Sequence, residues 1–226
     1  MPPGFDDAVL MCLCAVLASR LASRRTEPIK ILANKYKTRI REIKWAMARQ
    51  NPPPLVTNSR LHIGFMPDSE ILNRQIIEGY LQLREQDFLR RSHFFGGRYE
   101  NLYFERERIP AIARVLEQAE NYAQNLLQQT NSLRSGFWIN DMGPGESTTE
   151  HDHDEDDEML SAVYYVQVPQ DSGDLVIVDR YSRTLLTPQA GMFVFFAPSV
   201  VHSVSVNRSA ERRISMGMNF GPVSKE

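Results

Sequence analysis

Residues 145–168 read GESTTEHDHDEDDEMLSAVYYVQV, and this stretch decides how the rest of the chain is interpreted. It carries two histidines, His151 and His153, in an acidic segment, followed by a run of β-branched and aromatic residues. Side chains two positions apart on an extended strand project from the same face. Both imidazoles would therefore lie on the same face of the strand, where the two together can bind one metal ion.

Short β-branched and aromatic runs continue on both sides of this stretch, with glycine and proline between them. Regularly spaced runs of this length are typical of an antiparallel sandwich or barrel. We therefore predict an α+β fold in which helices flank a small β-structure. The predicted strands are residues 137–140, 160–168, 174–178, 191–196, 200–206 and 213–220.

The part of the chain before residue 134 has a helical pattern. Helices are predicted over 68–92 and over 109–130, where Pro110 suits a first helical turn. The run Pro52-Pro53-Pro54 ends any preceding helix and indicates a boundary near 51–58. We therefore expect a helical extension over 1–57 and a domain over 58–226, with supporting helices in 68–130 and a β-core in 134–222.

Charge is unevenly divided along the 226 residues. Residues 20–49 hold ten lysines and arginines against two glutamates, so the local balance is +8 within a net charge of −2. This basic segment is interpreted as a solvated amphipathic helix, with docking onto an acidic partner such as RNA as the alternative. The net charge itself argues against a general nucleic-acid-binding protein.

The N-terminal segment also bears on compartment. The apolar run over 8–18 is too short to span a bilayer, and arginines follow it rather than precede it, unlike a secretory signal. Cys12 and Cys14 are too close in sequence to form a disulfide framework. We expect a protein of the cytoplasm without a membrane span.

A second group of polar residues follows late in the chain. His202 lies in the predicted strand 200–206, and Arg213 and Ser215 share one face of the last predicted strand. An arginine that points into a small barrel is costly unless it is paired, and a carboxylate is its best partner. Ser215 can donate its hydroxyl to the same carboxylate.

These pieces, in this order, resemble the Fe(II)/2-oxoglutarate-dependent dioxygenases. The resemblance covers residues 134–222 and is closest to bacterial prolyl-hydroxylase-like oxygenases that have a His-x-His motif. The residues that carry it are Gly145, His151-x-His153, residues 161–165, Pro198 with His202, and Arg213-Ile214-Ser215.

The resemblance implies a double-stranded β-helix, a jelly-roll of the cupin-like kind. It implies that His151 and His202 hold Fe(II) and that Arg213, with Ser215, binds the distal carboxylate of 2-oxoglutarate. Tyr165 and, more weakly, Asn140 would contact this cosubstrate. The implied reaction uses molecular oxygen and hydroxylates a substrate, a protein side chain or a small molecule, with release of succinate and CO2.

The sequence departs from that family at one position, because His153 stands where a carboxylate is usual. Three arrangements follow: His153 is itself a ligand, or His153 and Glu155 form the ligand pair, or Asp152 or Asp154 turns inward. The spacing from Gly145 favours the first. Zinc also accepts three histidines, so the ligand count leaves Fe and Zn open.

Two functions of other classes compete with this one. A three-histidine cupin-type dioxygenase would need no 2-oxoglutarate, and a binding module would need no catalytic metal. The remaining histidines, His62 and His93, stand alone in the sequence and are interpreted as structural. Phosphate-binding loops, dinucleotide-binding glycine motifs and the Gly-x-Ser-x-Gly elbow are absent from the sequence.

Overall fold

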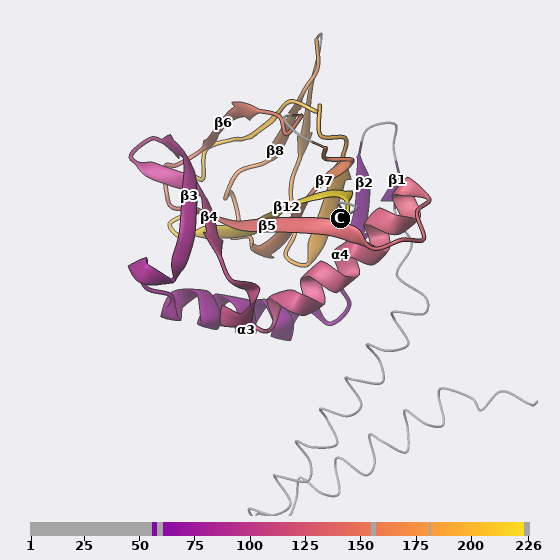
Figure 1. The fold of residues 1–226 in the computed structure, drawn as a ribbon. Coiled ribbons are helices and arrows are strands. Elements are labelled where there is room, and N and C mark those ends of the chain that lie inside the picture. Colours follow the sequence, from indigo (N-terminus) through magenta and orange to yellow (C-terminus); the bar gives the residue numbers. More distant parts are fainter. Residues whose placement is uncertain (1–55, 58–60, 155–156, 181, 224–226) are drawn as a thin grey trace, which may run out of the picture. The chain divides into compact units, whose positions relative to one another are not determined.

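The computed structural model describes residues 56–57, 61–154, 157–180 and 182–223 (Figure 1). Two α-helices, two short 3-10 helices and twelve strands are found in these residues. They are β1 Val56–Thr57, β2 His62–Phe65, α3 Ser69–Gln82, η1 Glu85–Asp87, β3 Phe88–Phe95, β4 Arg98–Phe104, η2 Arg106–Arg108, α4 Ile112–Leu127, β5 Leu133–Met142, β6 Thr148–His151, β7 Leu160–Gln167, β8 Leu175–Val178, β9 Arg183–Leu186, β10 Met192–Phe196, β11 His202–Val204 and β12 Arg213–Pro222.

Strands β5 to β12 build a jelly-roll from two antiparallel sheets. Within the described part of the chain, the larger sheet has the order β1-β2-β10-β7-β12-β5-β4-β3, and the smaller has the order β6-β11-β8-β9. Apart from the β8–β9 hairpin, successive core strands alternate between the sheets, with β5, β7, β10 and β12 in one and β6, β8, β9 and β11 in the other. The predicted α+β jelly-roll is confirmed for the described residues.

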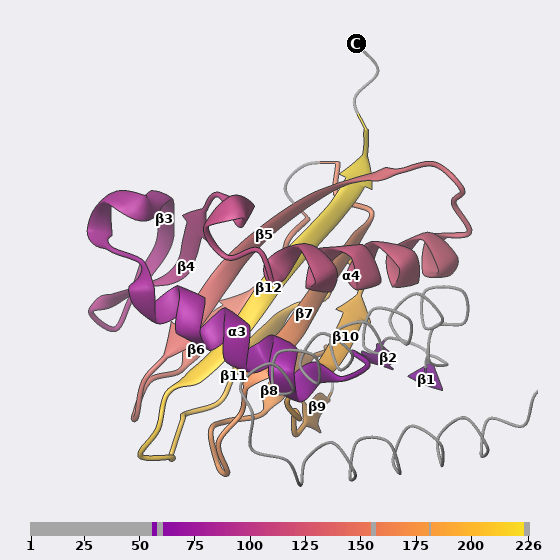
Figure 2. The same cartoon turned by 90° about the horizontal axis from the view of Figure 1, so that it is seen from below.

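Helices α3 and α4 both lie on the outer face of the larger sheet (Figure 2). One stripe of α4 is apolar and faces the sheet, as the spacing of Ile112, Val115 and Ala119 predicts, and all three are fully buried. Tyr122 of the same stripe packs against Phe193 and Phe195 of β10. The helices therefore cover this face of the larger sheet.

The prediction of one helix over 68–92 is wrong in its second half. Helix α3 ends at Gln82, and residues 88–95 form β3, which pairs with β4 in a hairpin. Gly96 and Gly97 make its turn, both with positive φ (58° and 85°), a conformation that glycine adopts without strain. Two glycines between aromatic-rich segments are a hairpin signal that the helical interpretation overlooked.

Several sequence expectations fall on other parts of the chain. The helical extension over 1–57 and its basic segment lie almost wholly outside the described residues, so both stay predictions. In the described residues, no helix combines the length and the apolar character that a bilayer crossing requires.

Candidate metal centre

The imidazoles of His151, His153 and His202 form one cluster at the smaller sheet. His151 ends β6 and lies directly opposite His202, the first residue of β11, in the antiparallel ladder. His153 lies two residues beyond β6, where its backbone N–H donates to the carbonyl of Pro198 at 2.9 Å. One ligand atom from each ring lies within 4.8 Å of the others. The structure thus brings together the three histidines that the sequence singled out.

Two of these rings are held in one tautomer by the backbone. His151 Nδ1 lies 2.9 Å from the carbonyl oxygen of Thr149, and His202 Nδ1 lies 2.9 Å from that of Val200. A carbonyl only accepts hydrogen bonds, so each Nδ1 carries the proton and each Nε2 keeps its lone pair. Fixing the outer ring nitrogen in this way is the usual support of a metal-ligating histidine.

Burial keeps two of the imidazoles uncharged. Burial, with the nearby His151 acting in the same direction, lowers the pKa of His202 to about 3. Burial likewise lowers the pKa of His153 to about 4, with His151 and His93 acting in the same direction. Both rings are therefore neutral at pH 7, which is the form that binds a metal ion.

These two shifts predict a pH dependence of stability for the metal-free protein. Below the ordinary histidine pKa of 6.5, His153 and His202 bind protons in the unfolded chain but stay unprotonated in the folded protein. The free energy of unfolding should therefore fall between pH 7 and 5, by at most about 1.4 kcal/mol per pH unit for each ring. Urea titrations at several pH values measure this slope.

A His153→Asn variant provides the control for that slope. It removes one of the two buried rings, so the fall in unfolding free energy should be about half as steep. An identical slope in both proteins would mean that His153 gains its proton equally easily in the folded and unfolded chains.

The structure bears on two of the three ligand arrangements that the sequence allows. Asp152 and Asp154 are exposed and lie outside the histidine cluster, as strand alternation indicates. Glu155 falls outside the described residues, so its pairing with His153 stays a prediction. Among the described residues, the cluster that forms is the one made of three histidines.

A cavity between the two sheets joins this cluster to the predicted cosubstrate residues. It contains about 620 Å³ of unfilled space, the part open to solvent included. The four residues proposed from the sequence to contact cosubstrate share its lining with the three histidines. They are Asn140 on β5, Tyr165 on β7, and Arg213 and Ser215 on β12.

Arg213 is buried in this cavity without an acidic partner. Its side chain is 2% exposed, and among the described residues no carboxylate lies within 4.0 Å of it. Nη1 donates to the carbonyl of Gly173 at 2.7 Å, and the guanidinium lies over the ring of Tyr165, 5.1 Å from its centroid. Burial lowers the pKa of Arg213 from its ordinary value. A buried guanidinium in this state is a strong site for an anion.

The residues around Arg213 complete a polar end to the cavity. Tyr165 is fully buried, and its O–H has no hydrogen-bond acceptor among the described residues. Ser215 is buried on the same strand as Arg213, two residues along. The Nδ2 of Asn140 donates to two groups of β4, the carbonyl of Glu100 at 2.7 Å and Asn101 Oδ1 at 2.9 Å. Its contact with a cosubstrate stays a prediction.

Sequence reasoning missed several residues that line the same cavity. Glu100 and Asn101 enter it from the hairpin strand β4, and Trp138 enters from β5. His93 on β3 was interpreted as isolated, yet its ring centroid lies 6.0 Å from that of His151. The hairpin turn Gly96-Gly97 is the sequence signal that would have brought β3 and β4 to this edge.

A glycine on β12 makes room for the indole beside the histidines. A Cβ at Gly217 would overlap the ring of Trp138, which itself packs against His153 with ring centroids 5.4 Å apart. On the other side, Phe196 packs against His202 at 4.7 Å. Two aromatic rings therefore flank the cluster and exclude water from part of it.

Comparison with known proteins agrees with this architecture. The sequence matches no family model, and no curated protein matches it either. Solved structures do match. The non-heme α-ketoglutarate-dependent carbocyclase SnoK from nogalamycin biosynthesis has a TM-score of 0.58 and 15% identity, over 76% of this chain and 87% of that one.

Two prolyl hydroxylases are similar to the same degree. The prolyl-4-hydroxylase of Pseudomonas putida has a TM-score of 0.51 and 17% identity, over 73% of this chain and 90% of its own. A prolyl hydroxylase from Trichoplax adhaerens, solved with a peptide fragment of the hypoxia inducible factor, has a TM-score of 0.55 and 11% identity, over 82% and 92%. This chain has the 2-oxoglutarate oxygenase fold. At these identities the likeness establishes the fold alone.

Proposed function

We propose that the protein is an Fe(II)- and 2-oxoglutarate-dependent oxygenase that hydroxylates its substrate. The observation that carries the proposal is a single cavity that contains both three converging imidazoles and a buried guanidinium without a carboxylate partner. The overall reaction consumes 2-oxoglutarate and O2 and gives succinate, CO2 and the hydroxylated product.

The donor set fits a divalent transition metal. His151, His153 and His202 offer three imidazole nitrogens on one side, which leaves room for further ligands on the other. Iron bound there would supply the redox chemistry that couples O2 to the oxidation of cosubstrate and substrate. What the chain itself supplies is ligand geometry, orientation of the cosubstrate and exclusion of water.

The far end of the cavity fits the distal carboxylate of 2-oxoglutarate. Arg213 would donate two parallel N–H bonds to it, and the O–H groups of Tyr165 and Ser215 would donate to the same oxygens. Among the described residues, neither the guanidinium of Arg213 nor the O–H of Tyr165 has a carboxylate or another acidic group to donate to. A cosubstrate held at this end would direct its oxo-acid end toward the histidines.

A cupin-type dioxygenase that uses no 2-oxoglutarate is the alternative that the three histidines favour. That reaction provides no anion to pair with the buried Arg213, and an unpaired internal charge is costly. Anaerobic titration with Fe(II) and 2-oxoglutarate discriminates between them. Our proposal predicts a visible charge-transfer absorption band that needs both components, and succinate release in air. Absence of the band with tightly bound Fe(II) would favour the cupin-type reaction.

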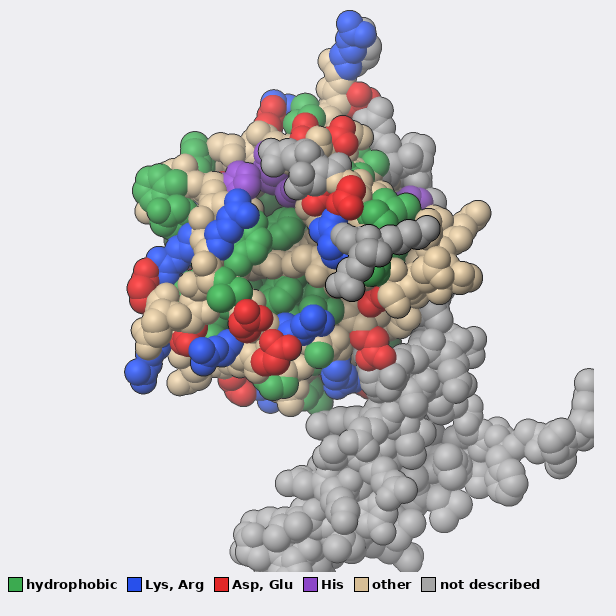
Figure 3. All heavy atoms as spheres, viewed as in Figure 1, with side chains coloured by type: hydrophobic (Ala, Val, Ile, Leu, Met, Phe, Trp, Pro, Cys, Tyr) green, Lys and Arg blue, Asp and Glu red, His purple; other side chains and the backbone are tan. Residues whose placement is uncertain are grey.

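A peptide is the substrate class that the outer surface supports best. The tip of the β3–β4 hairpin exposes Phe94, Phe95 and Tyr99, with Phe94 66% exposed. Figure 3 shows hydrophobic side chains gathered at this end of the molecule, a short distance from histidine. Exposed aromatic groups beside a cavity commonly bind an extended partner, and one structural neighbour was solved with a peptide.

The aromatic tip yields a prediction for substrate use. Replacing Phe94 and Phe95 together by serine should raise KM about tenfold for peptides selected from a library by succinate release, with kcat little changed. The reason is that the tip contacts the peptide outside the reacting atoms. Leu81→Ser, at an equally exposed leucine on α3, serves as the control. Equal KM values in all three proteins would argue against a peptide on the hairpin.

A further inference from the structure

The three-histidine cluster lacks a negative charge of its own. Its ligands are imidazoles, which bind a metal ion in their neutral form. A divalent cation would therefore bring two uncompensated charges into a largely apolar cavity, which is costly. Among the described residues that line this cavity, Glu100 is the one acid.

Glu100 reaches the cavity from outside the jelly-roll. It lies on β4, the second strand of the hairpin, and its side chain is 2% exposed. Carboxylates are rarely buried to this extent unless they are paired or coordinate a cation.

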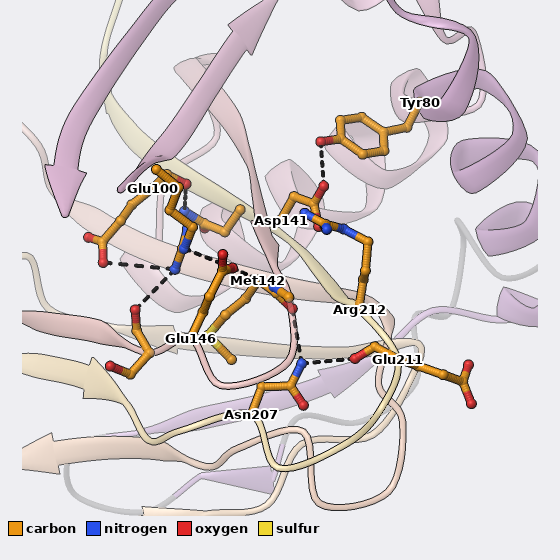
Figure 4. Close-up of polar contacts among 12 residues, drawn as sticks. Tyr80, Glu100, Asp141, Met142, Glu146, Asn207, Glu211 and Arg212 are labelled. Atoms are coloured by element: carbon orange, nitrogen blue, oxygen red, sulfur yellow. Dashed lines mark hydrogen bonds and ion pairs between the residues drawn. The ribbon is translucent and has the colours of Figure 1, made fainter. Parts of the chain in front are cut away.

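The cation nearest to Glu100 is only partly engaged with it. Arg98 Nη2 lies 4.0 Å from Glu100 Oε1, at the limit of an ion pair. Arg98 has shorter contacts elsewhere, 3.0 Å from Nε to Glu146 Oε2 and 3.0 Å from Nη2 to the Ser147 carbonyl (Figure 4). Glu100 Oε1 has no hydrogen-bond partner among the described residues. One oxygen of this buried carboxylate is therefore left without a donor.

Glu100 and His151 line the same cavity. Burial raises the pKa of Glu100, while Arg98, His151 and the backbone of Thr149 oppose this rise. The carbonyl of Thr149 also accepts from His151 Nδ1 at 2.9 Å. Glu100 is therefore placed to act through space on the segment that carries His151.

We propose that Glu100 is the charge-compensating residue of the metal centre, supplying from the hairpin the negative charge that His153 removes from the usual ligand position. The inference rests on the proposed function, since it concerns the same metal. Glu100 lies outside the cluster of direct ligand atoms, so it acts as a positioning and electrostatic residue. Carboxylates in this role commonly change metal affinity by 10- to 100-fold.

The direct test is the metal affinity of a Glu100→Gln protein. Calorimetric titration with Mn(II), and anaerobically with Fe(II), should give a dissociation constant at least tenfold higher than in the unchanged protein, because glutamine keeps the size but loses the charge. Glu146→Gln is the matched control: it removes the other carboxylate partner of Arg98, which does not line the cavity, and should leave the affinity within about twofold.

Two further variants separate an electrostatic role from a structural one. Glu100→Asp keeps the charge and should recover most of the affinity. Arg98→Gln removes the cation that shares the carboxylate and should tighten metal binding several-fold, whereas a purely structural role predicts no change or weaker binding. This second measurement decides the matter even where Glu100→Gln does not fold.

The outcomes also separate this inference from the proposed function. Equal metal affinity in the unchanged and Glu100→Gln proteins, with succinate released by both, overturns the role of Glu100 and leaves the oxygenase intact. An unchanged protein that binds no divalent metal overturns both.

Discussion

A His202→Ala protein is expected to lose divalent metal binding almost completely. His202 begins β11 opposite His151, so its removal leaves two ligands that both come from one short segment. We expect the affinity for Fe(II) or Zn(II) to fall by more than 100-fold. At a metal concentration of 100 times the original dissociation constant, most of the metal-dependent stabilisation of about 2.7 kcal/mol should then disappear. Thermal unfolding with and without metal measures this loss.

His62→Ala is the control for that experiment. His62 lies on β2, next to the edge of the larger sheet and outside the histidine cluster, so a His62→Ala protein should keep the full metal-dependent rise in unfolding temperature. If the His202→Ala protein gained as much stability from metal as the His62→Ala protein, the three-imidazole centre would be refuted.

The second large effect is expected at Arg213. An Arg213→Met protein should keep its metal affinity but bind 2-oxoglutarate at least 100-fold more weakly, because methionine fills the space of the stem and offers no donors. Breaking a buried pair between a carboxylate and a charged group typically costs about 3–5 kcal/mol. Titration of 2-oxoglutarate into the Mn(II)-loaded protein measures the change, and succinate release should be lost in parallel.

The neighbouring arginine supplies the control. Arg212 is about half exposed and pairs with the largely buried Asp141, Nε to Oδ1 at 2.7 Å. Arg212→Met should leave 2-oxoglutarate binding nearly unchanged, since Arg212 does not line the cavity. Unchanged cosubstrate affinity in the Arg213→Met protein would instead indicate a three-histidine enzyme of the cupin type.

Much of the jelly-roll could be predicted from sequence because its strands are short, apolar and separated by turn residues. The predicted run 160–168 matches β7, and 213–220 falls within β12. The strands that escaped prediction are polar or at sheet edges. Residues of β9, such as Arg183 and Leu185, are exposed, so no alternation of buried and exposed positions marks them.

That the histidines and Arg213 come together in one cavity could be predicted because their spacing along the chain resembles a known order. The place of Glu100 in the same cavity could not, since it depends on where the hairpin attaches. Strand β4 pairs with β5 at Leu102 and Ile139, positions 37 residues apart, and no local pattern reports such a pairing. The helical interpretation of 68–92 also concealed the first hairpin strand, and with it the position of His93.

The hairpin places an outward-facing aromatic ring and an inward-facing acid on consecutive residues. Tyr99 is 42% exposed at the tip, while Glu100 is buried in the cavity. A graft of this loop would therefore exchange the proposed recognition surface and the internal charge in one step. Engineering of new specificity on this scaffold should vary positions 94, 95 and 99 and hold position 100 constant.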